Sequence, residues 1–267
     1  PAEFLCARLA DAGGFHHPAV YMAEAVRLGI TVRPPHVNFS GHGFTLTYEH
    51  APDSEQPVLW MGLGQVRDLR AAAIAAIRAA RAGAPFAGVA DLLARVPLQP
   101  KEIDHLIRCG ALDGLGASRR AMLAEARDTR GRGGQLRFGF LDAPDSASES
   151  PAERLAWEME LLGQPVSVHP LALIRVPRGA TPLGRLPAAP GKPATVYAVR
   201  VPGWPGGAGI FIGDGETFVI ARFDKHLASD RGRRPTWRPL RLSGRWRRDE
   251  WEGGWLQVEG VEIVDGD

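Results

Sequence analysis

Apolar residues recur along this chain with two spacings, one typical of helices and the other of strands. Recurrence every three or four residues predicts helices over 1–9, 18–28, 66–82, 89–96, 100–109, 118–126 and 152–162. Alternation of apolar and polar residues predicts strands over 44–48, 195–201, 209–212, 218–223, 239–246 and 255–264. The pattern therefore changes from mostly helical to all-β near residue 194.

The segments between these elements favour loops and connections. Pro34 and Pro35 exclude a helix over 30–37, and the polar residues 51–57 predict a loop. Seven prolines in 165–193 predict an extended connection. Two further linkers are predicted, a basic Gly-rich stretch at 128–134 and an acidic, Ser-rich stretch at 143–150.

The last five predicted strands occupy about 70 residues, and closing such a set into a small barrel removes its exposed edges. We therefore expect an α+β, multidomain chain, with a mostly helical N-terminal part and a small all-β barrel. The predicted boundaries are 1–57, 58–130, 131–193 and 194–267.

Charge is balanced overall, with 32 Lys and Arg against 30 Asp and Glu, which excludes a uniformly basic protein. Its distribution is uneven. From Arg222 to Arg248 there are ten basic residues and two acids, whereas 249–267 carries seven acids and no Lys or Arg. Such blocks indicate either a basic face for a polyanion or two solvated faces of one sheet.

The two cysteines, Cys6 and Cys109, are too few for a disulfide framework, which favours the cytoplasm. No apolar run is long enough to span a bilayer, so no membrane association is expected. The histidines at 16, 17, 36, 42 and 50 lack a metal-ligand spacing, and we expect no metal site.

Two Gly-containing stretches, 61–70 and 107–116, each lead into a predicted helix. A tight hairpin that opens a helix exposes backbone N–H groups, which bind a phosphate without reading the base. The order of the two stretches predicts tandem helix-hairpin-helix elements. Their candidate DNA contacts are Gly62, Gly64, Arg67, Arg70, Gly110, Gly114, Gly116, Arg119 and Arg120.

Several short motifs together resemble the bacterial DNA polymerase III α subunit and its error-prone relatives. In order, they are PAEFLCARL, EAVRLGI, RPPHVN, GLGQVRDL, PFAGVADLLARV, LIRCGALDGLG and ERLAWEMELLGQPVSVHPL. The resemblance covers about 1–171 well and 194–264 loosely. Where this C-family has Gly-rich hairpins, the present chain departs from the pattern with Asp68 and Arg70.

The resemblance implies a role for each predicted region. Residues 1–57 would end the fingers, 58–130 would grip duplex DNA, and 194–267 would form an OB-like barrel. The family's catalytic palm aspartates have no counterpart here, so nucleotidyltransferase chemistry and its Mg²⁺ would belong to the parent polymerase. No cofactor and no catalytic residue are expected in this chain itself.

The segment 131–193 would contain a peptide that binds the sliding clamp. Gln135 would fix its register, and the apolar anchors would be Leu136, Phe138 and Phe140. Arg137 stands where an apolar residue is common, and the alternative is a loop whose phenylalanines fold back onto the core.

The barrel region interleaves aromatic residues with arginines, a pattern that serves single-strand binding by stacking and charge. We expect Phe211, Phe218 and Phe223 to be structural, and one or two of Trp204, Trp237 and Trp246 to be stacking platforms. The candidate single-strand contacts are Arg233, Arg234, Trp237, Trp246 and Arg247.

The sequence thus predicts a DNA-binding segment of a bacterial DNA polymerase that acts in replication or in error-prone repair synthesis. Its partners would be duplex and single-stranded DNA, the sliding clamp and other polymerase subunits. The alternatives are a stand-alone, non-catalytic accessory protein that binds nucleic acid and a decayed remnant of a polymerase.

Overall fold

The computed structural model describes residues 1–11, 15–51, 54–131, 148–207, 209–224, 227, 236–250 and 253–264. The chain forms two compact units. The helical unit is Val32–Ser167, and the barrel unit combines Pro1–Thr31 with Val168–Asp267. None of the helices in the described ranges is long and apolar enough to cross a membrane.

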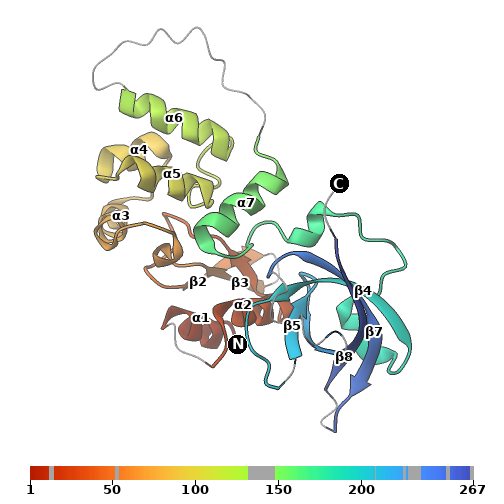
Figure 1. Ribbon diagram of the computed structural model, residues 1–267. Coiled ribbons are helices and arrows are strands. Elements are labelled where there is room, and N and C mark those ends of the chain that lie inside the picture. Colours follow the sequence, from red (N-terminus) through yellow and green to blue (C-terminus); the bar gives the residue numbers. More distant parts are fainter. Residues whose placement is uncertain are drawn as a thin grey trace. The chain divides into compact units, whose positions relative to one another are not determined.

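In the part of the helical unit that the structure describes there are five α-helices, one 3-10 turn and a small sheet. Figure 1 shows these helices and the sheet. The helical elements are η1 Leu63–Gln65, α3 Ala71–Gly83, α4 Val89–Arg95, α5 Pro100–Arg108, α6 Arg119–Gly131 and α7 Pro151–Leu162. The sheet has the order β1-β3-β2, with β1 Thr31–Arg33, β2 Thr45–Ala51 and β3 Ser54–Trp60.

Local sequence explains where two of these helices begin. Helix α5 starts at Pro100, and the side chain of Glu102 reaches back to accept the Gln99 N–H at 2.7 Å. Helix α7 starts at Pro151 with a reciprocal cap between Ser150 and Glu153. Proline at the first helical position has no N–H to leave unpaired, and a capping box gives acceptors to N–H groups that a helix end otherwise leaves unpaired.

The core of the helical unit lies among α3–α7. Its apolar residues are fully buried and come from every one of these helices or from the turns between them, for example Ile77, Phe86, Leu92, Leu106 and Leu161. Because α7 contributes Leu161 to the same core, the unit continues past the predicted boundary at residue 130 to Ser167.

Among the described residues of the barrel unit, five strands close in the order β4-β5-β6-β8-β7 (Figure 1). They are β4 Pro193–Val201, β5 Gly209–Gly213, β6 Phe218–Phe223, β7 Pro239–Arg248 and β8 Gly254–Ile263. Strand β4 pairs with both β5 and β7, and β6 pairs with β8 in parallel. This arrangement confirms the predicted OB-like barrel.

Two N-terminal helices, α1 Ala2–Ala10 and α2 Pro18–Arg27, belong to the barrel unit. Ala19 and Val20 of α2 share a buried cluster with Val201 and Phe211 of the barrel. The 3-10 turns η2 Pro170–Leu173 and η3 Leu183–Ala188 complete the unit.

Three sequence predictions about elements were wrong. Residues 54–57 are not loop, because β3 begins at Ser54 and pairs along its whole length with β2. The helix predicted from residue 66 begins at Ala71, because Asp68 is left-handed and Arg70 is extended. The connection 165–193 is not uniformly extended, since η3 buries Leu183 and Leu186 against the barrel core.

Candidate nucleic-acid interface

The two glycines of the first hairpin serve close backbone packing. A Cβ atom on Gly62 would lie 2.2 Å from the carbonyl oxygen of His42, and one on Gly64 would lie 2.9 Å from it. The Leu63 and Gly64 amides donate to the carbonyls of Gly41 and His42, both at 2.9 Å. These N–H groups are therefore already bonded within the protein.

Asp68 stands at the tip of the first hairpin in a conformation that favours glycine, with φ 58°. Its carboxylate forms an ion pair with Lys101 at 2.8 Å, and the hydrogen bond from Lys101 lowers the pKa of Asp68. The hairpin thus has an aspartate where the left-handed backbone would favour glycine. This aspartate places a negative charge three residues before α3.

Arg70 immediately precedes α3 and holds a buried carboxylate. Its guanidinium donates to both oxygens of Glu102, at 2.7 and 2.8 Å, and its backbone N–H donates to the same side chain. Glu102 is 1% exposed, and the hydrogen bond from Arg70, outweighing burial, lowers the Glu102 pKa to about 2. Arg70 is therefore engaged in holding α3 against α5.

The N-terminus of α3 is open. No described residue accepts a hydrogen bond from the backbone N–H groups of Ala71, Ala72 or Ala73, and Arg70 provides no side-chain cap. Arg67, one residue before Asp68, is exposed, and no acid of the described ranges forms an ion pair with it. Free amides, the positive end of a 13-residue helix and an exposed arginine together suit a phosphate.

The glycines of the second hairpin also serve the fold. Gly110 has φ +90°, and a Cβ there would lie 2.5 Å from Nη2 of Arg119. Gly114 has φ +85°, and a Cβ on Gly116 would lie 2.6 Å from the Met122 side chain. Each glycine is explained by backbone conformation or by close packing.

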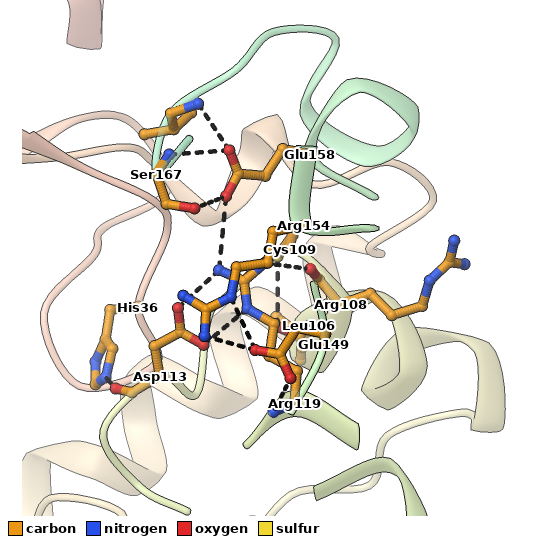
Figure 2. Close-up of polar contacts among 11 residues, drawn as sticks. His36, Leu106, Arg108, Cys109, Asp113, Arg119, Glu149, Arg154, Glu158 and Ser167 are labelled. Atoms are coloured by element: carbon orange, nitrogen blue, oxygen red, sulfur yellow. Dashed lines mark hydrogen bonds and ion pairs between the residues drawn. The ribbon is translucent and has the colours of Figure 1, made fainter. Parts of the chain in front are cut away.

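Arg119 lies at the centre of a buried polar network and is 1% exposed (Figure 2). It donates to both carboxylate oxygens of Asp113, at 2.9 and 2.7 Å, and to the Arg108 carbonyl at 2.9 Å. The fully buried Glu158 lies 3.5 Å away and is itself bound by the Ser167 amide and hydroxyl. The predicted DNA contact Arg119 is thus enclosed, with its guanidinium directed at acceptors of the protein itself.

The N-terminus of α6 is closed by Glu149. This carboxylate, 4% exposed, accepts the Arg119 N–H at 3.1 Å (Figure 2). The Arg120 amide also donates to it. Arg154 adds an ion pair at 2.7 Å. Burial acts to raise the Glu149 pKa, but the hydrogen bonds from its own backbone amide, from Arg154 and from the Arg120 amide outweigh burial, and the pKa is lowered. The third amide, of Ala121, donates to the Ser118 hydroxyl, so α6 offers no free N–H at its start.

Arg120 is half-buried and is engaged by an acid of the same unit, since it forms an ion pair with Glu153 at 2.5 Å. Together with Arg119, it shows that the two arginines of the second hairpin interact with the protein. The two hairpins therefore differ, because only the first leaves helix amides without a partner among the described residues.

The barrel places its predicted contacts in different environments. Trp246, a predicted stacking platform, is 5% exposed and packs inside the barrel core. Trp237 is half-buried against Phe211 and its neighbours, whereas Arg247 is exposed. Phe211 and Phe223 are buried, as expected for structural residues.

Residues of the basic block 222–248 and of the acidic block 249–267 form ion pairs between β7 and β8. Arg241 pairs with Glu262 at 2.8 Å, and Arg245 pairs with Glu259 at 3.1 Å. Much of the basic strand is therefore neutralised by the acidic strand beside it.

Several predicted residues lie outside the described ranges: Gln135, Leu136, Phe138, Phe140, Arg233 and Arg234. Within those ranges, no three His, Cys, Asp or Glu side chains gather as metal ligands would.

Sequence reasoning missed Glu149, Arg154 and Glu158. The motif ERLAWEMELLGQPVSVHPL begins at Glu153, so Glu149 lies just before it. Nothing in this stretch of sequence indicated that Glu149 and Glu158 contact Arg119, which is 30 and 39 residues away.

Comparison with known proteins adds the following. The model of a family described as a helix-hairpin-helix motif matches residues 29–122. An error-prone DNA polymerase of Anaeromyxobacter dehalogenans (strain 2CP-C) is 34% identical over 216 residues, covering 75% of this chain and 19% of that protein. One from Azoarcus sp. (strain BH72) is 34% identical over 182 residues, covering 66% and 17%.

The chain therefore spans about a fifth of the length of these curated relatives. Among solved structures, asparaginyl-tRNA synthetase from Pyrococcus horikoshii aligns with a TM-score of 0.29 at 17% identity, covering 33% of this chain and 23% of that one. That likeness is too slight to bear on function.

Proposed function

We propose that this chain, a relative of the error-prone DNA polymerases of the bacterial C family, is a segment that holds DNA for such a polymerase. The helix-hairpin-helix match and the polymerase relatives support DNA binding in general. The observation that carries the specific proposal is the open N-terminus of α3, with the exposed Arg67 four residues before it in the chain.

In this proposal the two hairpins have different tasks. The first binds a phosphate of duplex DNA through the amides of Ala71–Ala73 and the charge of Arg67. The second is structural, because Glu149 and Ser118 already bind the first amides of α6. Arg119 and Glu158 then hold α6 and α7 together, so that the open hairpin is presented by a rigid unit.

Matched arginine variants test this division. Arg67→Ala should weaken binding to a duplex and lower the slope of log affinity against log salt by about one. Arg120→Ala removes a charge of the same kind from the second hairpin and should leave the slope unchanged. If the wild-type chain binds no duplex at low salt, or if both variants behave alike, the proposal is wrong.

The finer partners extend this proposal. Residues 135–140 would bind the sliding clamp, and the barrel would contact single-stranded template. Gln135→Ala combined with Phe138→Ala should abolish capture by the clamp and leave duplex affinity unchanged. Retained capture would contradict the assignment. Nucleotide transfer, its Mg²⁺ and the cytoplasmic setting are likewise proposed for the parent polymerase.

A further inference from the structure

Two strongly exposed aromatic rings meet on the barrel unit. Trp204 is 60% exposed and lies in the loop between β4 and β5, while Phe15, 78% exposed, precedes α2. Their ring centroids are 6.4 Å apart, with planes tilted by 39°. Since the rings do not stack face to face on each other, most of their faces remain open to solvent.

The loop that carries Trp204 is held in place. Gly203 has φ +139°, and a Cβ there would lie 2.8 Å from Val20 and 3.3 Å from Phe211, so the backbone sits directly on the buried cluster. Pro205 restricts the backbone of Trp204 to extended conformations. The indole N–H of Trp204 also donates to the Gly207 carbonyl at 3.4 Å.

Phe15 is tied to the same cluster by the residue that follows it. His16 packs edge-on against Phe211, with ring centroids 5.9 Å apart, and against Tyr21 at 6.1 Å. Phe15 in turn contacts His16 at 5.3 Å. Both exposed rings are thus attached to segments that pack on the buried cluster. This packing restricts their motion and so lowers the conformational entropy that is lost when a ligand stacks on them.

We propose that Phe15 and Trp204 form a stacking site for bases of single-stranded nucleic acid. Five-stranded barrels of this topology bind oligonucleotides with the loop between their first two strands, which here is the loop of Trp204. Aromatic faces accept any base, so the site has little sequence preference. Two side chains are too small for a stable protein interface, which needs about 1,000 Å², but they match one or two bases.

The site includes a residue from outside the barrel strands, since Phe15 comes from the segment between α1 and α2. The N-terminal helices would therefore contribute to single-strand binding. This inference rests on the proposed DNA-binding function, and its test must separate the two.

The test measures binding of the full chain to an oligothymidylate of about 16 nucleotides. Phe15→Ala and Trp204→Ala should each weaken binding at least about fivefold, with an unchanged salt slope and unchanged duplex affinity. Phe4→Ala is the matched control, because Phe4 is 63% exposed on α1. Trp204→Phe keeps an aromatic ring and should retain most of the affinity.

An abasic strand of the same length separates stacking from phosphate contact. All variants should bind it as the wild-type chain does, because it has no base to stack. The inference is overturned if both alanine variants bind oligothymidylate normally, if they lose equal affinity for the abasic strand, or if they change only self-association. Wild-type binding to duplex but not to single strand also overturns it, whereas absence of both would defeat the proposed function as well.

Discussion

Glu149 accepts the backbone N–H of Arg119 at 3.1 Å, across 30 residues of sequence. A carboxylate at the N-terminus of a helix occupies the position that an external anion would otherwise take. Because Arg154 pairs with the same carboxylate, this contact also joins α7 to the start of α6. The second hairpin is therefore completed by the chain's own acid.

We expect Glu149→Ala to destabilise the helical unit by about 2–4 kcal/mol, since it removes a buried, charged acceptor from several donors. Chemical denaturation followed by circular dichroism measures this change. Glu160→Ala is the control, because Glu160 is 48% exposed in its ion pair with Arg108, and its loss should cost below about 1 kcal/mol. Equal effects of the two variants would contradict a structural role for Glu149.

Asp68→Gly should increase affinity for duplex DNA. The left-handed φ of 58° suits glycine, and the substitution removes a negative charge near the amides of α3. We expect a gain of several-fold at low salt that shrinks as salt screens the charges. Asp68→Asn keeps the side-chain shape and should show a similar gain. If neither variant changes the affinity for duplex DNA, the phosphate does not bind at the N-terminus of α3.

The barrel was predictable from sequence because β7 and the first half of β8 alternate between buried and more exposed residues, and because the short apolar run of β5 is bounded by glycines. All five strands lie within two residues of their predicted bounds. β3 was missed because its first half, with Glu55, Gln56 and Pro57, is polar and contains a proline. The apolar residues Val58 to Trp60 alone are too few to indicate a strand. The pairing of β3 with β2, rather than its own composition, makes it a strand.

The site was less predictable. A charged residue that is buried by pairing with a residue far away in the sequence cannot be distinguished, from the sequence alone, from a charged residue on the surface. Arg119 was expected to contact DNA, yet its neighbours Asp113 and Glu158 enclose it. The departure at Asp68 was visible in the sequence, but its left-handed backbone and its pairing with Lys101 depend on the fold.

Glu102 should make the stability of the helical unit depend on pH. Its pKa falls from an ordinary 4.5 to about 2 in the folded state, mainly through Arg70. Between these values the unfolded chain binds more protons, so stability falls as the pH drops from 4.5 through about 2. The stabilisation lost is about 3 kcal/mol.

Glu102→Gln removes this titration. Its free energy of unfolding should be lower than that of the wild-type chain at pH 7, and the difference should shrink as the pH falls from 4.5 through about 2. A difference that stays constant across this range would show that the carboxylate does not titrate as described.

Trp246 should be required for the barrel and not for binding. It is 5% exposed, pairs with Leu256 across β7 and β8, and lies 2.8 Å from where a Cβ on Gly254 would stand. Trp246→Ala should therefore destabilise the barrel unit by about 3–5 kcal/mol, measured by denaturant unfolding.

Trp246→Phe is the control. The indole N–H of Trp246 has no hydrogen-bond partner within the described ranges, so this variant loses volume but no hydrogen bond, and its loss of stability should be markedly smaller. Under conditions where both variants remain folded, their affinity for single strands should match that of the wild-type chain. A selective loss of binding without a loss of stability would mean that the ring leaves the core to meet the DNA.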